Sequence, residues 1–319
     1  MKRVLVTGGA GYIGSHVCEV LASAGYQVRI FDDFSHGLKR RITGRFSDIY
    51  DGDVTDRAAL ISALDGVAAV IHLAAKKAVE ESVANPLKYY ANNVGGTINL
   101  LAAMEVHKIK QIVFSSSAAV YSPNEKPAIE ESDPTQPLSP YGATKLLSEQ
   151  LISKVAQAEG LSAISLRYFN VVGATQVEFG DNSKDNLVPK VFAAYKSGAR
   201  PEIYGDDYPT KDGTCIRDYI HVGDLAEAHL AALERVAQSK VDAVYNVGSG
   251  TGYSVKEMMD QISKSMGVDL NPKLSPRRAG DSPQLIASTK KIESELGWRP
   301  KATLQEMIDS SWAAEKANS

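Results

Sequence analysis

The chain has 319 residues, of which 44% are hydrophobic and 23% charged, with a formal net charge of −3 and a pI of about 6.1. This composition supports one large domain or two smaller ones that share a cleft, and it lacks the basic surface that nucleic-acid binding requires. No apolar run reaches the length of a membrane span, and the sequence shows no metal-ligand spacing, so we expect neither a membrane segment nor a metal site.

The start of the first strand and the two cysteines both bear on the cellular compartment. The first strand is expected to start at about residue 2, which leaves no room for a signal peptide. Cys18 is expected in the core and Cys215 on the surface of a polar loop, far apart in sequence. Two unpaired cysteines are typical of a reducing compartment, so the sequence predicts a soluble cytoplasmic protein.

Short apolar runs alternate with helical patterns along the first half of the chain. We expect strands at 4–6, 28–31, 49–50, 69–72, 111–114 and 163–167, and helices at 12–24, 57–64, 86–106 and 141–159. Such alternation predicts a parallel sheet with right-handed crossovers. The basic cluster Lys39-Arg40-Arg41 is expected to be a solvated loop after the second strand.

The pattern changes beyond residue 170. Loops rich in Gly, Pro and Asp, at 173–186 and 205–213, separate shorter elements there. We expect a smaller lobe built around a ligand, interleaved with returns of the chain to the main sheet. The predicted domains are therefore 1–170, with those later returns, and 171–319.

A glycine loop lies between the first strand and the first helix. Gly8, Gly11 and Gly14 are spaced G-x-x-G-x-x-G, and Tyr12 and Ile13 begin the helix. Glycine lets backbone N–H groups approach a phosphate pair at the start of a helix. The spacing differs by one residue from the common G-x-G-x-x-G, so its position between a buried strand and a helix carries the inference. It predicts a dinucleotide site on an α/β fold, a Rossmann-type doubly wound parallel sheet with a smaller C-terminal substrate-binding lobe.

Acidic residues follow the next two strands. Asp32 closes the second strand, where a carboxylate accepts hydrogen bonds from the adenosine ribose and repels a 2′-phosphate. The predicted cofactor is therefore NAD rather than NADP. Asp53, next to Val54, is placed to reach the adenine amino group, although a helix N-cap or turn acid explains it nearly as well.

A tyrosine and a lysine stand four residues apart on a predicted helix. Tyr141 and Lys145 share one helix face, and the serines at 115–117 end an earlier strand of the same scaffold. An adjacent ammonium and the positive nicotinamide ring favour the phenolate, so we expect the pKa of Tyr141 to lie below its usual value near 10. A tyrosine of that kind can take a proton from a sugar hydroxyl during hydride transfer.

The whole chain resembles the extended short-chain dehydrogenase/reductase family, and within it the branch of UDP-hexose 4-epimerases. The motifs that carry this similarity lie at 7–16, 77–82, 92–94, 115–117, 139–141, 167–170, 186–189, 204–210, 212–214 and 217–222. The earlier motifs are shared across the family, whereas 204–222 is closer to the epimerase branch. The resemblance implies reversible C4 epimerisation of UDP-glucose and UDP-galactose, through a 4-keto intermediate, with tightly bound NAD.

The resemblance also implies roles for individual residues. Tyr141 would be the base, Lys145 would tune it and hold the nicotinamide ribose, and Ser117 would hydrogen-bond the sugar 4-oxygen. Further cofactor contacts would come from Lys77, Asn92 and Tyr168. The UDP-sugar would be held in the 171–319 lobe and at its edge by Asn170, Asn186, Leu187, Tyr204, Arg217, Arg278 and Asp281, with the ring of Tyr204 against the uracil.

Several alternatives stay open. Surface ion pairing also explains Arg217 and Arg278, although two arginines suit a pyrophosphate. Ala118-Ala119 stands where a 4,6-dehydratase usually carries an Asp-Glu pair, which argues against dehydration, whereas a UDP-glucuronate epimerase or decarboxylase is not excluded. A non-catalytic NAD-binding regulator is disfavoured by the intact tyrosine, lysine and serine.

Two further expectations come from the resemblance. Leu285 falls where side-chain size limits the substituent at sugar C2, and leucine is smaller than tyrosine, so N-acetylated UDP-hexosamines are expected to fit. The family is commonly a homodimer joined through the helices near 86–106 and 141–159. The apolar positions compatible with that interface are Leu100, Met104, Leu147 and Leu151.

Overall fold

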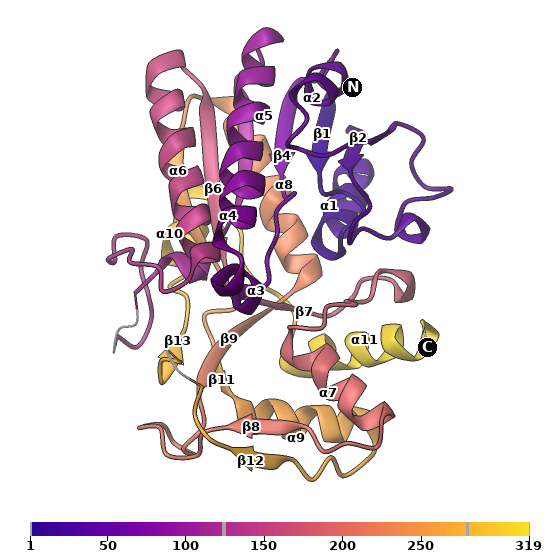
Figure 1. Cartoon of the computed structure of the whole chain (residues 1–319), viewed down its shortest axis with the longest axis vertical. Coiled ribbons are helices and arrows are strands. Elements are labelled where there is room, and N and C mark those ends of the chain that lie inside the picture. The colour runs from indigo at the N-terminus through magenta and orange to yellow at the C-terminus, as the bar shows by residue number, and fades with distance from the viewer. Residues whose placement is uncertain (1, 123–125, 279–280, 319) are drawn as a thin grey trace.

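A seven-stranded parallel sheet forms the larger part of the molecule. The computed structural model describes residues 2–122, 126–278 and 281–318, and its main sheet has the order β10-β6-β5-β4-β1-β2-β3 (Figure 1). The strands are β1 (Arg3–Thr7), β2 (Gln27–Asp32), β3 (Ile49–Asp51), β4 (Ala69–His72), β5 (Gln111–Ser117), β6 (Ser162–Tyr168) and β10 (Asp242–Val247). This arrangement confirms the predicted α/β, Rossmann-type fold.

Helices bury both faces of this sheet. One face packs against α1 (Tyr12–Ser23) and α8 (Val222–Gln238), and the other against α2 (Arg57–Ala63), α5 (Gly95–Val106) and α6 (Pro140–Glu159). Alternate residues of a strand point to opposite faces, so Val4 and Val6 belong to the first core and Leu5 to the second. Burial on both faces explains why the strands appear in the sequence as continuous apolar runs.

The helix expected at 86–106 is interrupted. It consists of α4 (Pro86–Tyr89), a π-helical segment at Tyr90–Val94, and α5. The π segment places Asn93 in the interior, where its Oδ1 accepts the Lys76 N–H at 2.9 Å and its Nδ2 donates to the Lys76 carbonyl at 3.0 Å. Lys76 belongs to the connection between β4 and α3 (Val79–Ala84). The two bonds therefore attach the π-helical segment to this connection, beside the carboxyl ends of the strands.

A smaller lobe follows β6. A four-stranded sheet contains β7 (Asn170–Val172), β9 (Ile216–His221), β11 (Gly252–Ser254) and β13 (Gln284–Leu285), and a separate pair is formed by β8 (Glu202–Tyr204) and β12 (Lys273–Ser275). Around them pack α7 (Leu187–Lys196), α9 (Val255–Met266) and α11 (Leu304–Ala317), seen in the lower half of Figure 1. The chain returns to the larger sheet with α8, β10 and α10 (Lys290–Leu296).

Two side chains predicted to be exposed are buried. Arg41 is 0% exposed, because its Nη2 donates to the Gly180 carbonyl at 2.6 Å and to Asn182 Oδ1 at 3.0 Å. Cys215 is 3% exposed, since the loop that carries it packs against the start of α9. The expectations of a wholly solvated basic loop and of a surface thiol are therefore wrong.

The apolar positions expected at a dimer interface divide into two sets. Leu100 and Met104 are 0% and 1% exposed and belong to the core under the sheet, and Leu151 packs against the same core. Leu147, on the outer face of α6, is 42% exposed. Helical periodicity alone could not separate a core face from an interface face.

Two kinds of feature are missing from the described part of the chain. None of its helices is both long and apolar enough to cross a membrane. No cluster of three or more His, Cys, Asp or Glu side chains that could hold a metal ion occurs among those residues.

Candidate active site

A cleft of about 1430 Å³ lies between the carboxyl ends of the large sheet and the smaller lobe. It opens beside β1 and β4, where the strand order reverses and open α/β sheets bind their ligands. Every site residue expected from the sequence lines it. These residues are Gly8, Gly11, Tyr12, Ile13, Gly14, Asp32, Asp53, Val54, Lys77, Asn92, Ser117, Tyr141, Lys145, Tyr168, Asn170, Asn186, Leu187, Tyr204, Arg217, Arg278 and Asp281.

The glycine loop crosses the floor of the cleft between β1 and α1. Gly8 has a φ of +73°, and a Cβ on Gly14 would lie 2.0 Å from the Gly8 carbonyl oxygen, so neither position admits a side chain. No side chain caps the start of α1 after Gly11. The first amides of this helix therefore remain available to an anion, and the loop fits the pyrophosphate of a dinucleotide.

Asp32 stands at the end of β2, beside this loop. Its Oδ2 accepts the Ala10 N–H and its Oδ1 accepts the Phe34 N–H, both at 2.9 Å, and it is 6% exposed. Burial raises the pKa of this carboxyl, and the two amides oppose the rise by favouring the carboxylate. The two bonds hold the acid where a ribose would meet it.

Asp53 belongs to a turn after β3. Its Oδ1 accepts the Thr55 N–H at 2.8 Å, while Asp56, and not Asp53, caps α2. The interpretation of Asp53 as an acid in a turn is confirmed, and the N-cap interpretation is wrong. The side chain also lines the cleft, so the turn positions it there.

Tyr141 and Lys145 face the cleft from one side of α6. Ser139 caps this helix by accepting the Gly142 N–H at 3.1 Å, with Pro140 at its first position, so α6 begins directly beside the end of β5. The Lys145 Nζ donates to the Ser115 carbonyl at 2.7 Å, and the hydroxyl of Tyr141 is hydrogen-bonded to Ser117. Tyrosine, lysine and serine thus form one connected group.

Burial is the largest influence on the pKa values of Tyr141 and Lys145. Burial raises the pKa of Tyr141, and the hydrogen bond to Ser117 opposes the rise. Burial lowers the pKa of Lys145 to about 7, opposed by the carboxylate of Glu149. The predicted lowering of the Tyr141 pKa invoked the nicotinamide cation together with the Lys145 ammonium, so it stays a prediction for the NAD-bound protein. The protein's own groups raise this pKa, because burial disfavours the phenolate.

The other end of the cleft carries two arginines joined by one acid. Asp281 Oδ1 lies 3.3 Å from Arg217 Nη2, and its Oδ2 lies 3.0 Å from Arg278 Nε. The Arg278 guanidinium also lies 5.0 Å from the centre of the Tyr204 ring. Ion pairing, one of the two interpretations of these arginines, is present, and it holds both guanidinium groups at the cleft wall beside an aromatic ring.

Two amides complete this end. Asn170 Nδ2 donates to the Asp218 carbonyl at 3.0 Å, and Asn186 Nδ2 donates to Asp181 Oδ2 at 2.6 Å. Asn186 directly precedes Leu187, the first residue of α7. The amide oxygens of both asparagines remain available to a ligand in the cleft.

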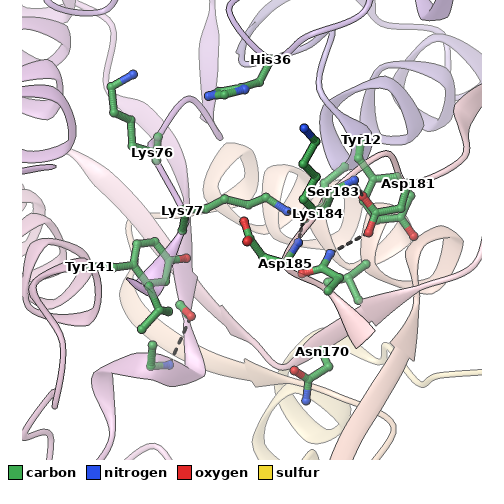
Figure 2. Close-up of a pocket in the computed structure, with 18 of the residues that line it drawn as sticks. Tyr12, His36, Lys76, Lys77, Tyr141, Asn170, Asp181, Ser183, Lys184 and Asp185 are labelled. Atoms are coloured by element: carbon green, nitrogen blue, oxygen red, sulfur yellow. Dashed lines mark hydrogen bonds between the residues drawn. The ribbon is translucent and has the colours of Figure 1, made fainter. Parts of the chain in front are cut away.

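The loop between β7 and α7 supplies residues that the sequence did not single out. Figure 2 shows Asp181, Ser183, Lys184 and Asp185 opposite Lys77 and Tyr141, and Lys77 Nζ donates to Ser183 Oγ at 3.0 Å. The Gly- and Asp-rich composition of 173–186 was the available signal. It marked a loop without showing which side chains face the cleft.

The comparisons with known proteins agree with this geometry. The NAD dependent epimerase/dehydratase family matches residues 4–248. A UDP-glucose 4-epimerase of Bacillus subtilis is 44% identical over 329 aligned positions, covering 99% of this chain and 97% of that protein.

Solved structures give the same result. The UDP-glucose-4-epimerase of Stenotrophomonas maltophila, with bound NAD and formylated UDP-arabinopyranose, has a TM-score of 0.95 at 37% identity, covering 100% of this chain and 99% of that one. The UDP-Glc/GlcNAc 4-epimerase of Campylobacter jejuni has a TM-score of 0.87 at 38% identity, covering 99% and 100%. Fold, cleft and sequence similarity together show that this chain belongs to the NAD dependent epimerase/dehydratase family.

Proposed function

We propose that this chain interconverts UDP-glucose and UDP-galactose by reversible epimerisation at C4, with NAD held throughout the turnover. The observation that carries the proposal is one cleft in which Tyr141 lies between the glycine loop at one end and the paired arginines at the other. A dinucleotide and a nucleotide sugar that meet at a tyrosine base can exchange hydride at a sugar hydroxyl carbon.

Three side chains of the protein have separate roles in the proposed reaction. NAD, held by the glycine loop and Asp32, would supply reversible hydride transfer at sugar C4. Tyr141 takes the proton of the 4-hydroxyl and gives it back, and Ser117, hydrogen-bonded to Tyr141, holds the sugar 4-oxygen. Lys145 supplies positive charge below the tyrosine and holds the nicotinamide ribose. Because the oxidised nicotinamide is itself cationic, it adds to the charge that favours the phenolate.

Inversion at C4 requires a sugar that turns while its nucleotide stays fixed. Arg217 and Arg278 hold the pyrophosphate, and Tyr204 lies against the uracil. The 4-keto sugar, held through its nucleotide, is then free to present its other face. The cleft of about 1430 Å³ has room for both ligands.

The two predicted domains are assigned to the two proposed ligands. Residues 1–170, with the later returns of the chain to the main sheet, form the NAD-binding part. Residues 171–319 form mainly the part that binds the UDP-sugar. Gly8 to Gly14, Asp32, Asp53, Val54, Lys77, Asn92 and Tyr168 are the proposed cofactor contacts.

The test is the conversion of UDP-galactose by the purified protein. We expect UDP-glucose to form without added reductant and without release of NADH. Formation of a 4-keto-6-deoxy sugar nucleotide would indicate a dehydratase instead. Turnover confined to UDP-glucuronate would indicate a UDP-glucuronate epimerase or decarboxylase. Binding of NAD without conversion of any of these substrates would indicate a non-catalytic NAD-binding regulator.

A wider sugar specificity is favoured by Leu285. This leucine lines the cleft and packs against the cluster that contains Ala118 and Phe169. A tyrosine would fill the space next to it, so we propose that UDP-N-acetylglucosamine is also epimerised. Leu285→Tyr is expected to abolish turnover of the N-acetylated sugar and to spare UDP-glucose, and wild-type protein inert toward UDP-N-acetylglucosamine would contradict the idea.

A homodimer is proposed from an exposed apolar face. Leu87 is 83% exposed, Val83 63% and Ile98 51%, and Leu147 on α6 lies on the same side of the sheet as α5. Apolar side chains gathered over neighbouring helices are typical of an interface between subunits. Leu87→Glu with Ile98→Glu is expected to give monomers in analytical ultracentrifugation, and dimers of unchanged affinity would refute this surface.

The site of action is proposed to be the cytoplasm, where nucleotide sugars and NAD are both available to a protein with two unpaired thiols. The two cysteines, Cys18 and Cys215, are free and buried. Localisation of a fluorescent fusion in the cell tests this directly.

A further inference from the structure

Behind Tyr141 and Lys145 lies a buried ion pair that the proposed mechanism does not use. Glu149 follows Lys145 by one turn of α6 and is 5% exposed, and Arg167 of β6 is also 5% exposed. Arg167 Nη2 lies 2.7 Å from Glu149 Oε2, and its Nε lies 3.0 Å from Oε1. This bidentate geometry fixes the carboxylate in orientation.

The strand β5 connects this pair to the catalytic group. Its last three residues each serve a different partner. The Ser115 carbonyl accepts from Lys145 Nζ, the Ser116 hydroxyl donates to Glu149, and Ser117 is hydrogen-bonded to Tyr141. Three consecutive backbone positions therefore hold the base, the lysine and the acid in one fixed arrangement.

Arg167 is anchored from its far side. Its Nη1 donates to the Tyr121 hydroxyl at 3.0 Å, and that hydroxyl donates to Asn246 Oδ1 at 2.6 Å on β10. The pair is thus tied to the strand that returns late in the chain. An ion pair held this completely cannot swing away from Lys145 during turnover.

We propose that Glu149, clamped by Arg167 and Ser116, is a positioning residue that keeps Lys145 charged beside Tyr141. The inference rests on the proposed function, because it assigns the acid a role in the same reaction.

The charges around Lys145 support this role. The other titratable side chains that face the lysine or the ion pair are Tyr141 on α6, His72 on β4, Tyr168 on β6, Tyr121, Glu131 and, beside Tyr168, His229 on α8. Burial, together with the Lys145 ammonium, lowers the pKa of His72 to about 3, and burial lowers that of His229 to about 4. Burial raises the pKa of Tyr121 to about 12 and raises that of Tyr168. These four groups are neutral near pH 7.

Among the described residues, Glu149 is the one whose negative charge opposes loss of the Lys145 proton. Burial lowers the pKa of Lys145 to about 7, and the carboxylate of Glu149 opposes this fall. Glu131, whose pKa burial raises, is engaged by the Asn246 N–H at 2.7 Å. Loss of the Glu149 charge would let Lys145 lose its proton at a lower pH, and Tyr141 would then lose the cation that favours its phenolate.

The test compares pH profiles of the NAD-loaded enzyme. For Glu149→Gln we expect the alkaline limb of kcat to move down by about one pH unit and kcat at pH 8 to fall about tenfold, while KM changes less than about threefold. Glu149→Asp, which retains the charge, is expected to restore the limb. Asp224→Asn is the matched control, since Asp224 is 6% exposed, holds the Lys301 and Ala302 amides at 3.0 Å and does not line the cleft.

A second measurement does not depend on turnover. Ultraviolet titration of each protein against its Tyr141→Phe counterpart isolates the ionisation of Tyr141, which is expected to move to higher pH in Glu149→Gln. If that variant fails to fold because Arg167 is left unpaired, Glu149→Gln with Arg167→Met removes both charges. Smaller shifts in the same direction are then expected, because loss of the Arg167 cation partly offsets loss of the Glu149 charge.

Some results would overturn the proposal. They are an unchanged alkaline limb and unchanged Tyr141 ionisation in a folded Glu149 variant, or an equal shift in the Asp224 control. If the wild-type protein epimerises no UDP-sugar, the proposed function fails, and the Tyr141 titration still decides whether Glu149 acts through Lys145.

Discussion

The hydroxyl of Tyr12 donates a hydrogen bond to the carbonyl of Gly173 at 2.6 Å, across 161 positions of sequence. It joins the first turn of α1 to the loop after β7. Burial raises the pKa of Tyr12, so the hydroxyl remains a donor over the whole neutral range. Gly173 has a φ of +97°, and a Cβ there would lie 2.2 Å from His221, so this close approach depends on a glycine.

Tyr12→Phe tests that link. The variant leaves the Gly173 carbonyl without this donor, so we expect the free energy of unfolding to fall by about 1–2 kcal/mol. NAD affinity is expected to fall only a few-fold, because the helix amides remain. Urea unfolding and isothermal titration with NAD measure the two effects. Unchanged stability would show that water replaces the hydroxyl without cost.

Asp32→Asn tests the proposed ribose contact. The amide can accept only through one atom and carries no charge, so NAD affinity is expected to fall about 10–100-fold and discrimination against NADP to weaken. The neighbouring Asp33→Asn is the control, because Asp33 is exposed and accepts only from Ser35. Equal losses in both variants would contradict a specific role for Asp32.

Tyr141→Phe removes the proposed base. The ring retains its packing, but no group then takes the 4-hydroxyl proton, so kcat is expected to fall about 10²–10⁴-fold with NAD binding intact. Ser117→Ala, which removes the partner of that hydroxyl, is expected to lower kcat less. A phenylalanine variant with near-normal kcat would remove Tyr141 from the mechanism.

Arg217→Met tests the nucleotide end of the cleft. Loss of a charge-assisted contact to a phosphate is expected to raise KM for the UDP-sugar about 10–100-fold, with a smaller change in kcat. Arg277→Met is the matched control, because Arg277 pairs with Asp207 and lies outside the cleft lining. A KM for Arg217→Met no higher than that of the control would point to a structural ion pair alone.

The burial of His229 predicts part of the loss of folding stability at acidic pH. Burial lowers its pKa from 6.5 to about 4, and its Nε2 has no hydrogen-bond partner within the described residues. The unfolded chain therefore binds more protons below pH 6.5, and stability present above that pH is lost as the pH falls toward 4. His229→Met is expected to recover about 2 kcal/mol at pH 4.5 relative to pH 7.5. Parallel pH curves for the two proteins in urea unfolding would show that this histidine is not responsible.

His16 and His72 retain acid sensitivity in that variant. Burial lowers the pKa of His16 to about 4, and burial with the Lys145 charge lowers that of His72 to about 3. The slope of stability against pH is therefore expected to decrease in His229→Met without vanishing.

The amino-acid sequence by itself determined the local structural features of this protein. Alternating apolar runs and helical periods specify the strands and helices of the main sheet, because burial on one face or two depends only on nearby spacing. The G-x-x-G-x-x-G loop and the Tyr-x-x-x-Lys pair are likewise local, since one turn and one helix face bring their members together. That locality explains why the residues expected to contact the cofactor could be chosen from the sequence, and all of them line the cleft.

Only the tertiary structure decided how distant segments meet. The π-helical turn at Tyr90–Val94 carries Asn93, which is hydrogen-bonded to Lys76, and Arg41 is covered by segment 180–182. Neither contact has a local periodicity that a sequence pattern could reveal. The ion pair of Glu149 and Arg167 is of the same kind, since its strength depends on desolvation and on the geometry of two elements that the fold brings together.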